Sequence, residues 1–256
     1  MSKFVNFRHK QSTKETSMIE CKRCKSNKVV KNGFVNKKQR YLCKECGYNF
    51  VEGDRRTNPK IKAMKAWCVL LYALCKASFN MLAKIFHTWP SLVYYWICQA
   101  GNALPETKIS DTIQKIEFDE MWHFIQKKAN KLWLIKAMDR KTKRTIAWVL
   151  GKRDAKTFAR LYSKLSHLDH CIFYTDDWDA FSKILPQKRH IIGKQHTVAI
   201  ERDNSNTRHH LGRFARRTKV VSKKTEMVDL SIKLWNALTS PDIFSQYQTV
   251  ALSIFR

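Results

Sequence analysis

Apolar residues recur at helical spacing soon after residue 59 and predict the first helices of the chain. The recurring positions are Ile61, Met64, Trp67 or Cys68, Leu71, and Leu74 or Cys75. Ser78 is placed to cap a shorter helix, His87 to Pro90 interrupts it, and Ser91 is placed to cap a third helix that ends at Gly101. This order predicts a helix-turn-helix over residues 59–103, and a plain helical bundle or a dimer contact fits the same pattern.

A different pattern begins near Gln114, where Ile116 and Phe118 alternate with Glu117 and Asp119. A strand there places the two apolar side chains on one face and the two acids on the other. The further expected strands are 122–125, 132–138, 145–150, 170–175 and 190–192, and the expected helices are 154–165, 180–185 and 197–217. An antiparallel meander followed by alternating helices and strands predicts an α/β catalytic domain with a ribonuclease-H-like mixed sheet and flanking helices.

Four of the eight cysteines form two C-x-x-C pairs separated by 18 residues. Cys21 and Cys24 make the first pair, and Cys43 and Cys46 make the second. Four thiolates at this spacing predict a zinc ribbon, with Gly47 supplying a positive φ after the second pair and a short hairpin between the pairs. A redox pair, or a zinc ion that serves folding alone, is the alternative.

The net charge of the chain indicates what kind of partner it binds. The sequence has 49 Lys and Arg against 21 Asp and Glu, which leaves a formal net charge of +28. Such a surplus indicates a polyanion, and nucleic acid fits better than an anionic membrane surface. The longest apolar stretch, Ala66 to Leu74, is far shorter than a bilayer span of roughly 20 residues, so a buried helix is expected there. No secretory signal is seen in the first 20 residues, and the thiols suit a reducing compartment, so a cytoplasmic, nucleoid-associated protein is expected.

Three acids are candidates for a two-metal phosphoryl-transfer site, which needs carboxylates from separate elements. Asp119 and Asp176 come from two strands that can lie adjacent, and Glu201 lies in a segment otherwise rich in Lys and Arg. Glu201 and Arg208 share one helix face, which would direct a carboxylate and a guanidinium the same way. Asp119 as a solvated strand residue, and Glu201 as the ion-pair partner of Arg208 or Arg202, are the simpler explanations.

Four motifs together resemble the transposases named after insertion sequence one, in the order that this family has them. They are Tyr41-Leu-Cys-Lys-Glu-Cys-Gly-Tyr-Asn-Phe50, Asp119-Glu-Met-Trp122, Tyr174-Thr-Asp-Asp-Trp178, and Ile200-Glu-Arg-x-Asn204 with Arg208. The resemblance runs from Cys21 to about Thr218 and implies a zinc ribbon and helix-turn-helix joined to a catalytic domain with a DDE triad. By motif match the triad falls on Asp119, Asp176 and Glu201, while Asp177 and Asp203 are neighbouring acids that leave alternatives open.

The resemblance implies binding to the terminal inverted repeats of an insertion sequence, 3′-end cleavage and strand transfer into target DNA, by a homodimer or higher oligomer on double-stranded DNA. Two magnesium ions would be held by the triad, beside the structural zinc. The DNA backbone would be held by Arg208, Arg213, Arg216 and Arg217. A non-catalytic zinc-ribbon DNA-binding protein, such as a repressor or a decayed transposase, and an RNA-binding basic protein are the alternatives.

The domain boundaries follow from these segments. The expected order is a basic arm (1–20), zinc ribbon (21–55), helix-turn-helix (59–103), catalytic domain (114–225) and C-terminal helical tail (226–256).

Overall fold

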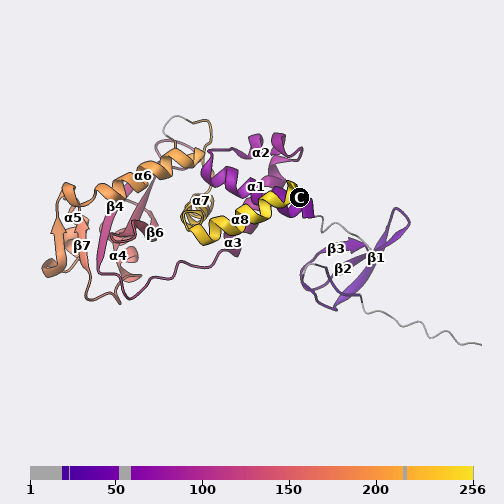
Figure 1. The fold of residues 1–256 in the computed structure, drawn as a ribbon, viewed down its shortest axis with the longest axis horizontal. Coiled ribbons are helices and arrows are strands. Elements are labelled where there is room, and N and C mark those ends of the chain that lie inside the picture. Colours follow the sequence, from indigo (N-terminus) through magenta and orange to yellow (C-terminus); the bar gives the residue numbers. More distant parts are fainter. Residues whose placement is uncertain (1–18, 23, 52–58, 216–217, 256) are drawn as a thin grey trace, which may run out of the picture. The chain divides into compact units, whose positions relative to one another are not determined.

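A computed structural model of the chain describes residues 19–22, 24–51, 59–215 and 218–255 (Figure 1). The chain divides into two compact units, residues 1–58 and 59–256. Most of the expected basic arm, and Arg216 and Arg217, lie outside the described residues.

The first unit contains a three-stranded antiparallel sheet in the order β1-β2-β3. The strands are β1 (Val29–Val35), β2 (Lys38–Cys43) and β3 (Asn49–Val51). Asn36 and Lys37 form the two-residue turn between β1 and β2, and both have positive φ, as a type I′ hairpin requires. Tyr41 and Phe50 are buried with Cys21 and Cys43, so the small core of this unit lies directly against the cysteines.

Five helices of the second unit share one hydrophobic core. They are α1 (Pro59–Leu74), α2 (Phe79–Ile85), α3 (Pro90–Ala103), α7 (Thr225–Leu238) and α8 (Pro241–Leu252). The expected apolar helix at 66–74 is therefore a buried part of α1, and the segment expected as a C-terminal tail completes the bundle that begins with the helix-turn-helix segment. None of the described helices combines the length and apolar character that crossing a membrane requires.

The caps of two bundle helices can be compared with the expectation. Ser78 caps α2, accepting a hydrogen bond at 3.2 Å from the backbone N–H of Met81, as its position in the sequence predicts. Ser91 does not cap α3, because the helix begins at Pro90 with Trp89 at the cap position, two residues before Ser91. Proline suits the first helical position because it has no N–H to leave unsatisfied there.

The middle part of the second unit's sequence forms a five-stranded mixed sheet, in the order β6-β5-β4-β7-β8. Its strands are β4 (Lys115–Phe124), β5 (Lys131–Asp139), β6 (Arg144–Gly151), β7 (Ile172–Thr175) and β8 (His190–Ile192). β4, β5 and β6 form an antiparallel meander, whereas β7 runs parallel to both β4 and β8. The two strands expected at 116–119 and 122–125 are one continuous strand, β4.

Helices cover both faces of this sheet. They include α4 (Ala155–Ser163), α5 (Asp179–Ile184) and α6 (Val198–His210), with short 3-10 turns at Gln187–Arg189, Lys194–His196, Gly212–Phe214 and Ser253–Phe255. Phe118 of β4 packs with buried residues of α4 and α5 on one face. Met121, an odd number of residues along β4, packs with α7 on the other face. Helix α7 therefore contributes buried residues both to the core of the bundle and to the core on this face of the sheet.

Candidate functional site

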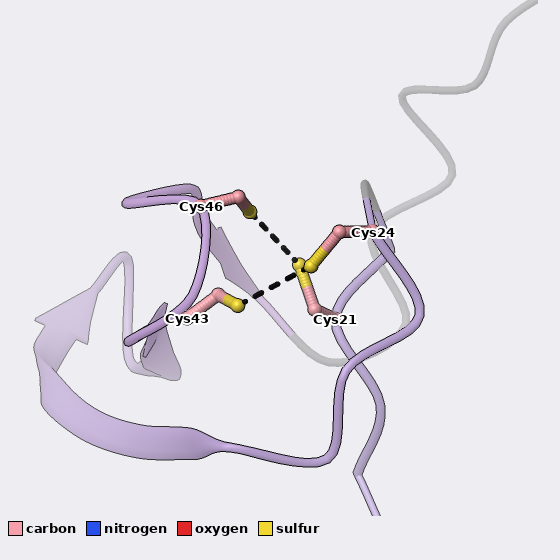
Figure 2. Close-up of side chains that lie close together, drawn as sticks. All are labelled: Cys21, Cys24, Cys43 and Cys46. Atoms are coloured by element: carbon pink, nitrogen blue, oxygen red, sulfur yellow. Dashed lines mark hydrogen bonds between the residues drawn. The ribbon is translucent and has the colours of Figure 1, made fainter.

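The four cysteines of the two C-x-x-C pairs lie together in the first unit, with their sulfur atoms all within 4.8 Å of one another (Figure 2). The Sγ atoms of Cys21 and Cys46 are 3.6 Å apart, and those of Cys24 and Cys43 are 3.5 Å apart. Four sulfurs at about 2.3 Å from a tetrahedral zinc ion would be about 3.8 Å from one another. The donor set and its spacing therefore suit one zinc ion.

Tight backbone turns present both cysteine pairs. The N–H of Gly47 donates to the carbonyl of Cys43 at 2.9 Å, and Gly47 has φ +68, so the expected positive φ is confirmed. In the first turn the N–H of Lys25 donates to the carbonyl of Cys21 at 2.8 Å, and Lys25 has φ +63. The two turns have the same conformation although only one carries the glycine that favours it.

Asp119 and Asp176 lie close together because β4 and β7 are parallel neighbours. Glu117 of β4 is the partner of Tyr174 in β7, so the two aspartates follow at equivalent distances along the two strands. Among the described residues, Asp119, Asp176 and Glu120 each offer a carboxylate oxygen within 4.8 Å of those of the other two. The sheet thus gathers two of the expected acids and a third that the sequence did not single out.

Glu120 is the residue that sequence reasoning missed. It stands inside the quoted motif Asp119-Glu-Met-Trp122, which was the available signal, but strand alternation assigns it to the face opposite Asp119. β7 ends at Thr175, and Asp119 and Glu120 lie beyond the last residue of β4 that pairs with it. Side chains from both faces of β4 can therefore reach Asp176 at this open edge.

Burial and the charge of a neighbouring carboxylate raise the pKa of two of these three acids, Asp119 and Glu120. Burial, and next the charge of Glu120, raises the pKa of Asp119 to about 7, against a hydrogen bond from Asn204 that lowers it. Burial also raises the pKa of Glu120, although its hydrogen bond with Arg153 acts in the opposite direction. One oxygen of Glu120, Oε2, is buried with no hydrogen-bond partner. A bound divalent cation would satisfy this oxygen and offset the repulsion, so the residues fit such an ion.

Helix α6 is attached to β4 by two carboxylates on one face of the strand. The Glu117 carboxylate accepts a hydrogen bond at 3.2 Å from the backbone N–H of Ile200 in the first turn of α6, whose own cap residue, Thr197, makes no side-chain capping bond. Four residues along the helix, Asn204 Nδ2 donates to Asp119 Oδ2 at 2.7 Å. Residues two apart on the strand thus contact residues one turn apart on the helix, which fixes their mutual register.

The two neighbouring acids of α6 lie in different surroundings. Asp203 faces the sheet, where its Oδ2 accepts hydrogen bonds from Lys136 Nζ at 2.8 Å and Thr145 Oγ1 at 3.0 Å. Glu201 is exposed, accepts a hydrogen bond from Thr197 at 3.1 Å, and lines a cavity of about 570 Å³ that Asp119 and Glu120 also line. Glu201 is not among the three acids that lie within 4.8 Å of one another.

Arg208 and Arg213, both expected to contact DNA, also lie in different surroundings. Arg208 lines the cavity of Asp119 and Glu201, and its guanidinium donates to the backbone carbonyls of Trp122 at 3.3 Å and Phe214 at 3.5 Å. Arg213 departs from its expected role, because its side chain is buried and its guanidinium donates to Tyr72 Oη and Ser222 Oγ. In this structure Arg213 links the 3-10 turn Gly212–Phe214 to α1 and is not available to a phosphate.

Known proteins with similar sequences indicate the family to which this chain belongs. Residues 112–237 match the family model described as IS1 transposase. Over 120 residues the chain is 41% identical to insertion element IS1 2 protein InsB of Escherichia coli (strain K12). The aligned residues make up 47% of this chain and 72% of that protein. Insertion element IS1 9 protein InsB of the same organism is 40% identical over the same shares.

One solved structure, a simian T-cell lymphotropic virus intasome in complex with PP2A regulatory subunit B56 gamma, aligns with 66% of this chain and 68% of its own. Its TM-score of 0.34 and identity of 14% carry no argument about the fold.

Proposed function

Because the chain belongs to the IS1 transposase family, we propose that it is a DNA transposase that binds the terminal inverted repeats of its insertion sequence and catalyses metal-dependent 3′-end cleavage and strand transfer. One observation carries the catalytic part of this proposal. Asp119 and Asp176 are brought together by adjacent parallel strands, and Glu201 of α6 lines the same cavity as Asp119. These are the residues on which the family's motifs place the DDE triad.

The sheet supports a ribonuclease-H-like catalytic domain. Its first three strands form an antiparallel meander, the first strand is central, and the next two strands extend the sheet in parallel on the other side. Asp176 directly follows the carboxyl end of β7 and lies level with Asp119 in the middle of β4, at the edge of β4 that is open beyond its pairing with β7. We assign the catalytic centre to this edge.

The chain's own residues hold and orient the acids. Asp119, Asp176 and Glu201 would hold two magnesium ions, which when bound would polarise the attacking oxygen and neutralise the charge that develops on the phosphate. Asn204 fixes the Asp119 carboxylate through its hydrogen bond at 2.7 Å. Glu117 holds the first turn of α6 against β4 and so sets the position of Glu201 one residue beyond Ile200. The guanidinium of Arg208, in the same cavity, is placed to contact the DNA backbone.

The remaining parts of the chain would recognise DNA. The zinc ribbon, with Cys21, Cys24, Cys43 and Cys46 as ligands, would form a folded basic platform, and α2 and α3 would supply the helix-turn-helix. A formal net charge of +28 supports binding to a polyanion.

Nicking of a DNA that carries the element's own ends tests the catalytic assignment. Asp119→Asn, Asp176→Asn and Glu201→Gln are nearly isosteric and should each abolish magnesium-dependent nicking while DNA affinity is kept, since each removes one carboxylate from the metal centre. Asp177→Asn is the matched control, because Asp177 is an exposed acid next to Asp176. A parent protein that binds these ends without nicking them would instead indicate a non-catalytic DNA-binding protein.

A further inference from the structure

Glu120 has the surroundings of a metal ligand rather than of a surface acid. Its side chain is 6% exposed, and one of its carboxylate oxygens lies within 4.8 Å of those of Asp119 and Asp176. Its Oε2 has no hydrogen-bond partner although it is fully buried. A buried carboxylate oxygen without a partner is costly, and a carboxylate close to two others is repelled by them, so both features of Glu120 suit a bound cation.

Arg153 holds this carboxylate in place. Its Nε and Nη2 contact Glu120 Oε1 at 2.8 Å and 2.6 Å, which leaves Oε2 as the oxygen open to a ligand. The guanidinium lies 4.7 Å from the ring centroid of Trp178 and 5.3 Å from that of Trp133. These contacts restrain the arginine although its side chain is 40% exposed, so Glu120 is fixed before any ion binds.

We propose that Glu120 is a fourth acidic ligand of the metal centre, which forms with Asp119 and Asp176 a divalent-cation site already complete in the protein without DNA. The inference rests on the proposed function and deepens it, because it divides the metal centre into two positions. Glu201 is exposed and hydrogen-bonded to Thr197, outside the group of three close carboxylates. The position that uses Glu201 is therefore completed only when a DNA phosphate enters the cavity.

Titration of the DNA-free, full-length protein with Mn²⁺ alone, followed by calorimetry, tests this division. The parent should bind Mn²⁺, which shares with magnesium a preference for oxygen ligands. Glu120→Gln should weaken that binding by at least roughly 100-fold, the upper end of the effect of losing an outer-shell partner. Glu201→Gln and Asp177→Asn should bind Mn²⁺ as the parent does, although only Asp177→Asn should still nick DNA.

Parental Mn²⁺ affinity in folded Glu120→Gln would overturn the proposal, and so would loss of the DNA-free site in Glu201→Gln. Thermal unfolding without Mn²⁺ establishes that the variant is folded. If Glu120→Gln does not fold, Glu120→Asp takes its place, because it keeps the charge but withdraws the carboxylate by one methylene and should weaken Mn²⁺ binding. Failure of the proposed function would be a separate result. If the parent never nicks DNA, but its Mn²⁺ binding is lost in Glu120→Gln, the metal-site proposal stands and only the transposase activity is contradicted.

Discussion

Replacement of Asp203 by Asn should destabilise the second unit far more than replacement of its neighbour Glu201 by Gln. Lys136 of β5 has a side chain only 1% exposed, and its Nζ contacts Asp203 Oδ2 and Thr207 Oγ1 at 2.8 Å each. Asp203 supplies the carboxylate that compensates this buried cation. Asp203→Asn leaves the buried ammonium without the carboxylate that it contacts directly.

The expected magnitude follows from this burial. Removing one partner of a buried ion pair costs about 3–5 kcal/mol, because the remaining charge is uncompensated. For a unit that spans residues 59–256, each kcal/mol shifts Tm by roughly 2–4 °C, so the variant should melt roughly 6–20 °C below the parent. Burial lowers the pKa of Lys136, and the charge of Asp203 opposes this effect. Without Asp203 that pKa falls further, so the unfolded state takes up more protons and the loss of stability grows as pH decreases.

Thermal unfolding of Asp203→Asn, Glu201→Gln and the double variant Lys136→Met/Asp203→Leu measures these effects. The double variant should be more stable than Asp203→Asn, since it removes both charges and leaves an apolar pair. At temperatures where Asp203→Asn is folded it should still nick DNA, in contrast to Glu201→Gln. Equal melting temperatures for Asp203→Asn and Glu201→Gln would refute the structural role of the pair.

Three further predictions concern other parts of the chain. Burial, followed by the charges of Arg213 and Arg208, lowers the pKa of His123 from 6.5 to about 4, so the unfolded state binds more protons between these values. Urea unfolding should show stability falling as pH drops from about 6.5 to about 4, by up to about 3 kcal/mol, and His123→Gln should lack this contribution. Metal analysis should return one zinc per chain, lost in Cys43→Ser together with specific DNA binding; full zinc content in a variant without Cys21 and Cys43 would contradict the site. Glu117→Ala should remove the capping interaction of α6, at a cost of about 0.5–2 kcal/mol in chemical denaturation, and should slow nicking beyond the loss of folded protein because Glu201 is displaced.

Local sequence patterns predicted most elements of the fold. The strand at 190–192 and the cap at Ser78 agree with the structure, because each depends on residues close in the chain. The strand that carries Asp119 and the strand that leads to Asp176, which the sequence allowed to be adjacent, are neighbours in the sheet. The continuous strand β4 was split in the prediction, since its pattern of apolar residues changes where its covering elements change from α4 and α5 to α7.

The contacts that distinguish one acid or arginine from another could not be predicted, because they join distant segments. The separation between Asp203 and Lys136 is 67 residues, and that between Arg213 and Tyr72 is 141. Nothing near Arg213 in the sequence indicates that it is buried, since it stands in a basic segment that favours a surface position. Glu120 was missed for a related reason: the end of β7, and not the alternation of β4, allows it to approach Asp176.

The bundle that encloses α1 has a consequence for synthesis on the ribosome. Of the bundle helices, α1, α2 and α3 emerge first, but α7 and α8, which complete their apolar core, follow only after the whole sheet has been made. Until then the apolar surface of α1 that α7 and α8 cover is open to solvent, and a nascent chain of this kind is exposed to aggregation and to chaperones. Translation that stops shortly before residue 225 would therefore yield a sheet attached to a bundle without α7 and α8, and cellular proteases would degrade this product. Only a fully translated chain would accumulate in the folded state.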